Sequence, residues 1–291
     1  FSLSYLHHKN VLPNYASGAG VITGSTSTST PNIQLQSNIY QLTELNNAVS
    51  GQLNSQWSDN LSSEVRVAYR NYRRGQDPYN GPDYAQMNIC TDPTSQGGLF
   101  PASGATLCST GVPIVKLGPD TPRQANKFNT QQLTISANLQ WRVADHTIKL
   151  EYDRFHSKLY NLFVYGGGGT AITGGGSGGY YFDSLADFSA RQANELALTT
   201  TTTGDKNDGY VRWGYTINTV GLQDTWKINP HLTVNAGLRF DFYTADNSIQ
   251  LNNNFVTRYA TLYPGLVNTA TLDGRKKLQP RFGFNWQTTP N

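Results

Sequence analysis

The stretch Val220–Tyr243, VGLQDTWKINPHLTVNAGLRFDFY, decides the fold that the sequence predicts. Its second half alternates without interruption between one apolar and one polar set. The apolar set is Leu232, Val234, Ala236, Leu238, Phe240 and Phe242, and the polar set is Thr233, Asn235, Gly237, Arg239, Asp241 and Tyr243. Such alternation predicts a strand with two different faces. Because Asn229-Pro230-His231 is a turn signal after the preceding run, the unit is a long two-faced hairpin.

The rest of the chain repeats this unit. The predicted strands are 1–8, 38–57, 61–72, 127–141, 147–165, 209–228, 232–243 and 278–287. The connections alternate between short turns at 58–60, 143–146 and 229–231 and long loops at 9–36, 73–126, 166–208 and 244–277. Compact soluble domains rarely carry several loops longer than about 12–15 residues. Outer-membrane barrels do, with short periplasmic turns and long extracellular loops.

The predicted fold class is therefore all-β, a transmembrane antiparallel β-barrel with about eight strands visible. A closed sheet suits a membrane because it pairs every backbone N–H and C=O group where water is absent. Residues 1–291 are expected to form one partial barrel domain without a plug domain. The alternating run already begins at Phe1, so we expect a fragment or a processed chain.

Composition excludes several other classes of protein. Charged residues make up 14% of the 291 residues and hydrophobic residues 37%, both below the averages of about 25% and 45–50% for soluble domains. The net charge of +3 and the lack of a Lys/Arg run argue against a nucleic-acid partner. No stretch approaches the roughly 18 consecutive apolar residues of a transmembrane helix.

The tryptophans repeat at one position in the predicted strands. Trp57, Trp141 and Trp226 each end a strand just before a short turn, and Trp286 ends the last strand. We expect these four residues to form an aromatic girdle at one membrane interface. The alternative is that each tryptophan closes the end of a soluble barrel core.

Two features depart from the regular pattern. Asp224 shares the parity of Leu222 and Trp226, which places a carboxylate on the lipid side. The apolar parity also changes near Asn218-Thr219, and we expect a β-bulge there. The register of the second half of the hairpin is well fixed, because a slip by one residue would turn Arg239 towards lipid at a cost of roughly 2–4 kcal/mol.

The two cysteines, Cys90 and Cys108, lie in one loop rich in glycine and proline. An isolated pair of this kind predicts a disulfide in an oxidising compartment, and two unpaired thiols are the alternative. No histidine or further cysteine lies nearby, so no metal site is predicted.

No catalytic or metal-binding constellation is predicted, and no cofactor. The run Gly175–Gly179 fits the pattern of a nucleophile elbow around Ser177, but it is a glycine tract without the strand and helix that an elbow needs. The segment Asp205–Gly209 hints at Ca²⁺ ligation, and a solvated loop is the better interpretation. The chain is therefore not predicted to be an enzyme.

Inward charges are interpreted as the hydrated wall of a lumen rather than as a specific ligand site. They are Glu64, Arg66, Arg70, Lys149, Glu151, Asp153, Arg239, Asp241 and Arg281. A site for an unknown extracellular ligand is expected in the long loops instead. The candidate ligand-contacting residues are Arg73, Arg74, Asp77, Tyr79 and Tyr84, which could equally serve loop packing.

The opening hairpin resembles the barrel of TonB-dependent outer-membrane receptors. The resemblance is carried by Gln223-Asp224-Thr225-Trp226, Leu232-Thr233-Val234, Gly237-Leu238-Arg239-Phe240-Asp241 and the stretch Leu278–Trp286. The last stretch, approached through Thr271-Leu272-Asp273-Gly274, is similar in particular to the Oar-like branch. The close match covers about a quarter of the chain.

The resemblance implies a roughly 22-stranded barrel closed by a plug domain. Such a receptor imports a scarce ligand across the outer membrane of a Gram-negative bacterium with energy from a periplasmic TonB partner. We therefore expect a segment of such a receptor, in contact with outer-membrane lipid. The alternative is a complete eight-stranded barrel that acts as an adhesin or structural protein, since eight strands can close. A barrel lipase or protease ranks third.

Overall fold

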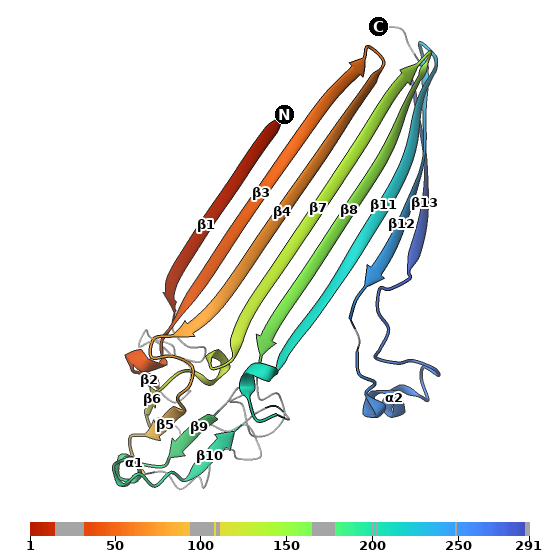
Figure 1. Cartoon of the computed structure of the whole chain (residues 1–291). Helices are drawn as coiled ribbons and strands as arrows, with labels where there is room; N and C mark the ends of the chain where they lie inside the picture. The colour runs from red at the N-terminus through yellow and green to blue at the C-terminus, as the bar shows by residue number, and fades with distance from the viewer. Residues whose placement is uncertain are drawn as a thin grey trace.

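The computed structural model describes residues 1–14, 32–93, 108, 111–164, 178–198, 201, 203–247 and 249–288. Eight long strands form one antiparallel sheet in the order β1-β3-β4-β7-β8-β11-β12-β13 (Figure 1). Their bounds are β1 (Ser2–Asn14), β3 (Tyr40–Ser58), β4 (Leu61–Pro78), β7 (Asn126–Val143), β8 (His146–Phe163), β11 (Tyr210–Asn229), β12 (Leu232–Ala245) and β13 (Lys276–Trp286). The all-β prediction is thus confirmed.

Tight turns join three of the hairpins at one end of the sheet, where the sequence predicts its short turns (Figure 1). They follow Ser58, Val143 and Asn229. Ala144 adopts a left-handed conformation (φ 49°) in the second turn, and the Asn229 side chain accepts the backbone N–H of His231 at 2.9 Å in the third. The longer connections all leave from the opposite end, which we call the loop end.

β1 and β4 reach further towards the loop end than predicted. β1 continues to Asn14 and β4 to Pro78, past the expected loop starts at residues 9 and 73. The predicted boundaries were wrong because they followed the end of apolar alternation. Strand pairing depends on backbone hydrogen bonds, which continue between β3 and β4 up to the pair Tyr40 and Pro78.

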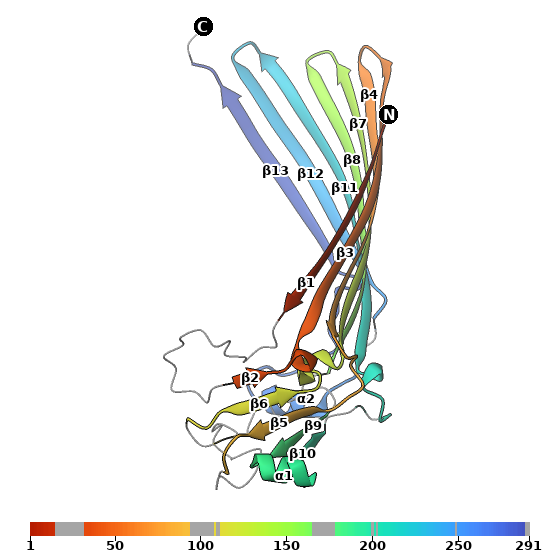
Figure 2. The same cartoon turned by 90° about the vertical axis from the view of Figure 1, so that its left-hand side faces the viewer.

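A second, smaller sheet lies at the loop end and is called the loop sheet here (Figure 2). Its order is β10-β9-β5-β6-β2, with β2 (Asn32–Gln34), β5 (Gln86–Cys90), β6 (Ile114–Leu117), β9 (Gly178–Phe182) and β10 (Glu195–Leu198). Its strands come from three successive connections of the large sheet. The pairs β2·β6 and β5·β9 are parallel, so segments distant in sequence are held side by side.

The helices are short. They are α1 (Leu185–Ala190), α2 (Asn253–Tyr259) and the 3-10 turns η1 (Gln36–Asn38), η2 (Thr121–Arg123) and η3 (Lys206–Asp208). The Ser184 side chain accepts the backbone N–H of Asp187 and caps the start of α1. The helix ends at the left-handed Arg191 (φ 59°), and the chain then enters β10. No helix in the described part of the chain is long and apolar enough to cross a membrane.

The β-bulge expected near Asn218-Thr219 was wrong. β11 pairs with β8 in one uninterrupted register from Tyr210 opposite Leu162 to Trp226 opposite His146. The apolar residues of β11 change parity because, near the loop end, its aromatic side chains lie on the face that is polar along the rest of the strand.

The large sheet is curved but open (Figure 2). Among the described residues, β1 pairs only with β3 and β13 only with β12, so the two outer strands do not meet. The sheet therefore does not close into an eight-stranded barrel.

Candidate functional site

One face of the large sheet carries a continuous apolar band. The register places Val49 opposite Tyr69, Leu150 opposite Leu222, and Leu238 opposite Pro280. Its other members are Leu3, Tyr5, Leu53, Val65, Val67, Leu133, Ile135, Leu139, Ile148, Val220, Phe240, Leu278, Phe282 and Phe284. Many of these side chains are exposed; Phe282 is 74% exposed and Leu3 69%. An uncovered apolar surface of this extent requires an apolar neighbour.

The four tryptophans lie near the tight-turn end of this apolar face, where β3, β7, β11 and β13 reach their turns or end. Trp57 and Trp286 are about two thirds exposed, and Trp57 donates its indole N–H to Ser63 at 2.9 Å. Their exposure argues against a role in closing a soluble core. Their depth in a membrane stays a prediction.

Asp224 also lies on the apolar face, where its side chain contacts His146. The Nδ1 atom of His146 is 2.6 Å from Asp224 Oδ2, and the imidazole stacks on the Trp226 ring with centroids 5.2 Å apart. A carboxylate at the edge of the apolar band is thus paired with a partner from the next strand.

The opposite face is polar along the part of the strands that carries the apolar band. Cross-strand hydrogen bonds join its side chains on both halves of the sheet. In β3 and β4, Arg66 donates to Gln52 at 2.7 Å and Arg70 donates to Asn46 at 2.8 Å. In β7 and β8, the Ser136 hydroxyl donates to Asp153. The predicted inward charges all lie on this face, as the strand register shows.

A hydrogen-bond network on the polar face surrounds Asp241. This residue is 4% exposed, and its carboxylate accepts from Thr219 and Arg239 at 2.8 Å and from Gln279 at 2.7 Å. Three adjacent strands, β11, β12 and β13, thus contribute to one charged cluster.

Beside this network lies a hollow of about 340 Å³. It forms where Gly221, Gly237 and Gly283 leave three neighbouring positions of the polar face without side chains. Glu151, Arg239, Arg281 and Lys149 line its rim. A group with both donors and acceptors could bind there.

Towards the loop end, the polar face becomes aromatic. Trp213 stacks on Tyr215 at 5.6 Å between centroids, and Phe155 lies 5.9 Å from Tyr215. A further hollow of about 220 Å³ lies between Trp213, Tyr215, Leu272 and Arg275. The sequence analysis missed this aromatic shelf (Phe155, Trp213 and Tyr215). Its signal was the odd parity of Trp213 and Tyr215, which was interpreted as a bulge.

The loop sheet has a conventional core. Cys90 and Cys108 form a disulfide, and both are fully buried with Ile114 and Tyr181. The Tyr181 hydroxyl lies 3.2 Å from the Cys90 sulfur.

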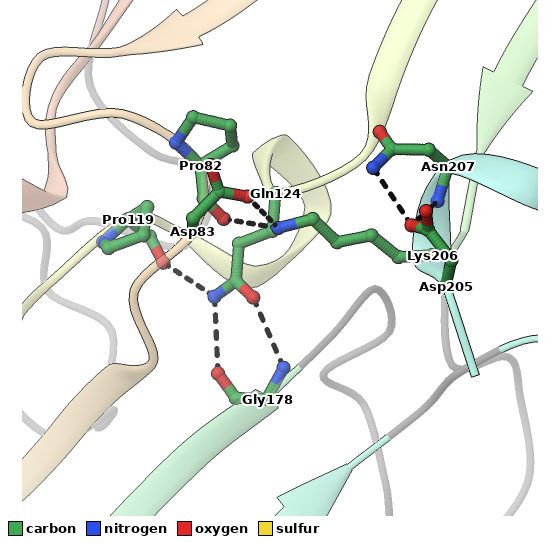
Figure 3. Close-up of polar contacts among 8 residues, drawn as sticks. All are labelled: Pro82, Asp83, Pro119, Gln124, Gly178, Asp205, Lys206 and Asn207. Atoms are coloured by element: carbon green, nitrogen blue, oxygen red, sulfur yellow. Dashed lines mark hydrogen bonds and ion pairs between the residues drawn. The ribbon is translucent and has the colours of Figure 1, made fainter.

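Polar contacts bind the connections to one another (Figure 3). The Gln124 amide donates to the carbonyls of Pro119 and Gly178 and accepts the Gly178 N–H, all at 3.0–3.1 Å. The Lys206 ammonium donates to the Pro82 carbonyl at 2.6 Å and is 2.9 Å from the Asp83 carboxylate. These contacts join the connection between β4 and β7 to the connection between β8 and β11.

Two buried ionisable groups belong to the same region. Burial raises the pKa of Asp120 above its ordinary value, although Arg123 and Lys116 act in the opposite direction. Burial likewise lowers the pKa of Lys116. Arg123 Nη1 lies 3.1 Å from Asp120 Oδ2, and the Arg123 guanidinium covers the Tyr40 ring at 4.6 Å.

The five candidate ligand-contacting residues do not converge. Arg73 and Arg74 are consecutive residues of β4 and so lie on opposite faces, and Asp77 also belongs to β4. Arg74 lies 3.7 Å from Glu44 on the polar face. Tyr79 and Tyr84 are exposed beyond the end of the strand.

The remaining candidates have simple structural roles or lie outside the described residues. Asp205 accepts the backbone N–H of Asn207 at 2.8 Å, and this bond lowers the pKa of its carboxyl. It thereby caps the 3-10 turn η3 (Figure 3). Ser177 lies outside the described residues. In the part of the chain that is described, no group of three or more His, Cys, Asp or Glu side chains could hold a metal ion.

Two solved structures are similar to this chain at low identity. The ferric-catecholate import receptor Fiu of E. coli K12, in its closed form, is similar over 99% of this chain and 38% of its own, with 13% identity and a TM-score of 0.42. The copper transporter OprC is similar over 84% of this chain and 28% of its own, with 10% identity and a TM-score of 0.35. This chain thus spans less than two fifths of the length of either. No curated protein sequence matches it.

A family model described as "Outer membrane beta barrel domain" matches residues 8–291, nearly the whole chain. The apolar band faces lipid in such a domain, and the polar face lines the interior. The chain belongs to the outer membrane β-barrel domain family, and its place is the outer membrane of Gram-negative bacteria.

Proposed function

We propose that this chain forms part of the wall of a TonB-dependent receptor, of the Oar-like branch, that binds a ligand outside the cell and imports it. The open sheet carries this proposal. Eight strands with a lipid-facing band and a polar interior leave β1 and β13 unpaired with each other. In a membrane, unpaired strand edges are costly, so further strands are needed to close the wall.

The interior face offers a ligand three successive surfaces that differ in chemistry. The aromatic shelf lies near the loop end, the Asp241 network lies deeper, and the glycine hollow lies deeper still. Aromatic rings can hold a ligand at the entrance, while charged and hydrogen-bonding groups suit polar solutes along the passage. The loop sheet brings three connections together at the loop end.

Because the hairpin resembles TonB-dependent receptors, the proposal includes TonB as the source of energy for import. In this proposal the short turns face the periplasm, a plug domain fills the interior, and TonB moves that plug. The ligand is taken up from the extracellular side, where the loop sheet lies.

Labelling of single cysteines in living cells tests the proposal. Gln223 and Leu222 are adjacent in β11 and lie on the polar and lipid-facing sides, respectively. In Gln223→Cys, a membrane-impermeant maleimide added outside should react in energised cells and much less in cells without TonB. The Leu222→Cys variant is the matched control and should remain unlabelled in both.

The competing functions give different results. Equal labelling of Gln223→Cys with and without TonB would contradict energy-coupled import. No labelling in either strain would favour a closed, eight-stranded adhesin or structural barrel, whose narrow interior excludes the reagent.

A further inference from the structure

The disulfide of the loop sheet is fully enclosed. Cys90 and Cys108 are both 0% exposed, and they form one buried cluster with Ile114 and Tyr181. Cys90 ends β5, the central strand of the loop sheet, which has β6 on one side and β9 on the other (Figure 2). Both edges of this strand are therefore paired, and solvent does not reach either cysteine.

Part of this enclosure comes from a distant segment of the chain. Tyr181 belongs to β9, in the connection between β8 and β11, and follows Cys90 by 91 residues. Its side chain is 0% exposed, and its hydroxyl lies 3.2 Å from the Cys90 sulfur. β9 pairs in parallel with β5 from Gln86 to Ile89. The Cys90 sulfur is therefore accessible only while β9 is away from β5.

The formation of a disulfide requires direct contact between sulfur atoms. One cysteine thiolate attacks the disulfide of an oxidant, binds one of its sulfur atoms in a mixed disulfide and releases the other as a thiolate. The thiolate of the second cysteine then displaces the oxidant, which leaves as a dithiol. The two cysteines lose two electrons and two protons in this exchange, and the oxidant accepts them. A protein oxidant must reach the sulfur atoms, which the closed loop sheet prevents.

We propose that a periplasmic protein with a reactive disulfide oxidises Cys90 and Cys108 before β9 docks on β5 and before the loop end crosses the outer membrane. The loop end is extracellular in the proposed receptor, whereas the protein oxidants of Gram-negative bacteria act in the periplasm. The chain therefore meets such an oxidant only on its way to the membrane. This modification goes beyond the import function and depends only on the orientation of the sheet.

Reduction of the native disulfide tests the enclosure. The purified full-length protein in detergent should react with reduced glutathione at least about tenfold more slowly than the urea-unfolded protein, because attack on the folded protein requires local opening of the loop sheet. Tyr181→Ala uncovers the Cys90 sulfur and should accelerate the reaction. Tyr180→Ala is the matched control at the adjacent, exposed position of β9, and it should react like the wild type.

Two results of this measurement would overturn the proposal. Equal rates for the native and unfolded proteins would show that the sulfur atoms remain accessible after the loop sheet has closed. Equal rates for the two tyrosine variants would show that β9 does not cover the disulfide. Heat-modifiable migration of each variant in gels confirms that its barrel is folded.

Pulse labelling in cells depleted of their barrel-assembly machinery tests the order of events. Acid quenching, followed by a maleimide of high mass under denaturing conditions, detects free thiols in the newly made full-length chain. Cys90 and Cys108 should already be unreactive, although the chain has not been inserted. Cys90→Ser is the labelling control, and its Cys108 thiol should react.

Oxidation at the cell surface would give a different result. Free thiols at Cys90 and Cys108 that disappear only after insertion would overturn the proposal. An unchanged rate of oxidation in cells without the periplasmic protein oxidant would do so too, because molecular oxygen or a small disulfide would then suffice. The measurement does not involve TonB, so failure here leaves the import proposal intact, and the converse also holds.

Discussion

The eight-stranded sheet leaves many of its large apolar side chains uncovered, whereas the loop sheet encloses a small core of its own. Leu238 and Phe282 of the large sheet are exposed, while Ile89, Ile114 and Tyr181 of the loop sheet are almost fully buried. The first sheet relies on backbone pairing and on lipid as its solvent. The second relies on a small core, a disulfide and hydrogen bonds between loops. The two sheets are thus stabilised by different interactions, and different substitutions should destabilise each of them.

The largest effect is expected from a charge placed on the lipid-facing side. Leu238→Arg should destabilise the large sheet by roughly 2–4 kcal/mol, because the cation must enter hydrocarbon. Gln223→Arg, on the interior face, should cost less than about 1 kcal/mol. Guanidinium unfolding of the protein in phospholipid vesicles measures both. Similar costs on the two faces would contradict the assignment of lipid and interior sides.

Removal of the disulfide should act on the loop sheet alone. The cysteines are 18 residues apart, and a crosslink of this length contributes about 3 kcal/mol. In Cys90→Ser/Cys108→Ser, amide exchange at Ile89 and Ile114 should accelerate, while exchange at Leu222 and Val234 stays unchanged. If the strands of the large sheet lost protection equally, the two sheets would be one cooperative unit.

A smaller effect concerns the pH dependence of the loop sheet. The raised pKa of Asp120 means that the folded state holds this proton more tightly than the unfolded state does. Stability contributed by this group is therefore lost as the pH rises from about 3.8 through the raised pKa. Asp120→Asn should flatten this dependence, measured as proteolysis of the loops across that window. An unchanged pH profile would show that Asp120 does not titrate there.

The smallest effect is expected at the tight-turn end of the lipid-facing side. His146→Ala removes the partner of Asp224 and should cost up to about 1 kcal/mol, since an acid near the interface is only moderately penalised. Asp224→Asn added to this variant should recover most of the loss. A double-mutant cycle in vesicles measures the coupling, and additive effects would show that the pair does not interact.

The large sheet could be predicted from the sequence because alternation is a local property. The run from Leu232 to Phe242 specifies its own faces, and the turn at Pro230 and His231 specifies its partner. The lipid-facing tryptophans and the inward charges follow from the same alternation.

The loop sheet and the ligand surfaces could not be predicted, since they depend on pairings between distant segments. β5 meets β9 across about 90 residues, and neither short strand has a distinctive pattern. The aromatic shelf was missed for a related reason. Trp213 and Tyr215 follow the strand register, but they lie near the loop end, where the polar face becomes aromatic.

The parallel pairs of the loop sheet also constrain the order in which the protein folds. β2 can meet β6, and β5 can meet β9, only after the β3–β4 and β7–β8 hairpins have brought these segments to the same end. Contacts of such long sequence separation form slowly. The loop sheet should therefore be the last part to assemble, after the strands of the large sheet have entered the membrane.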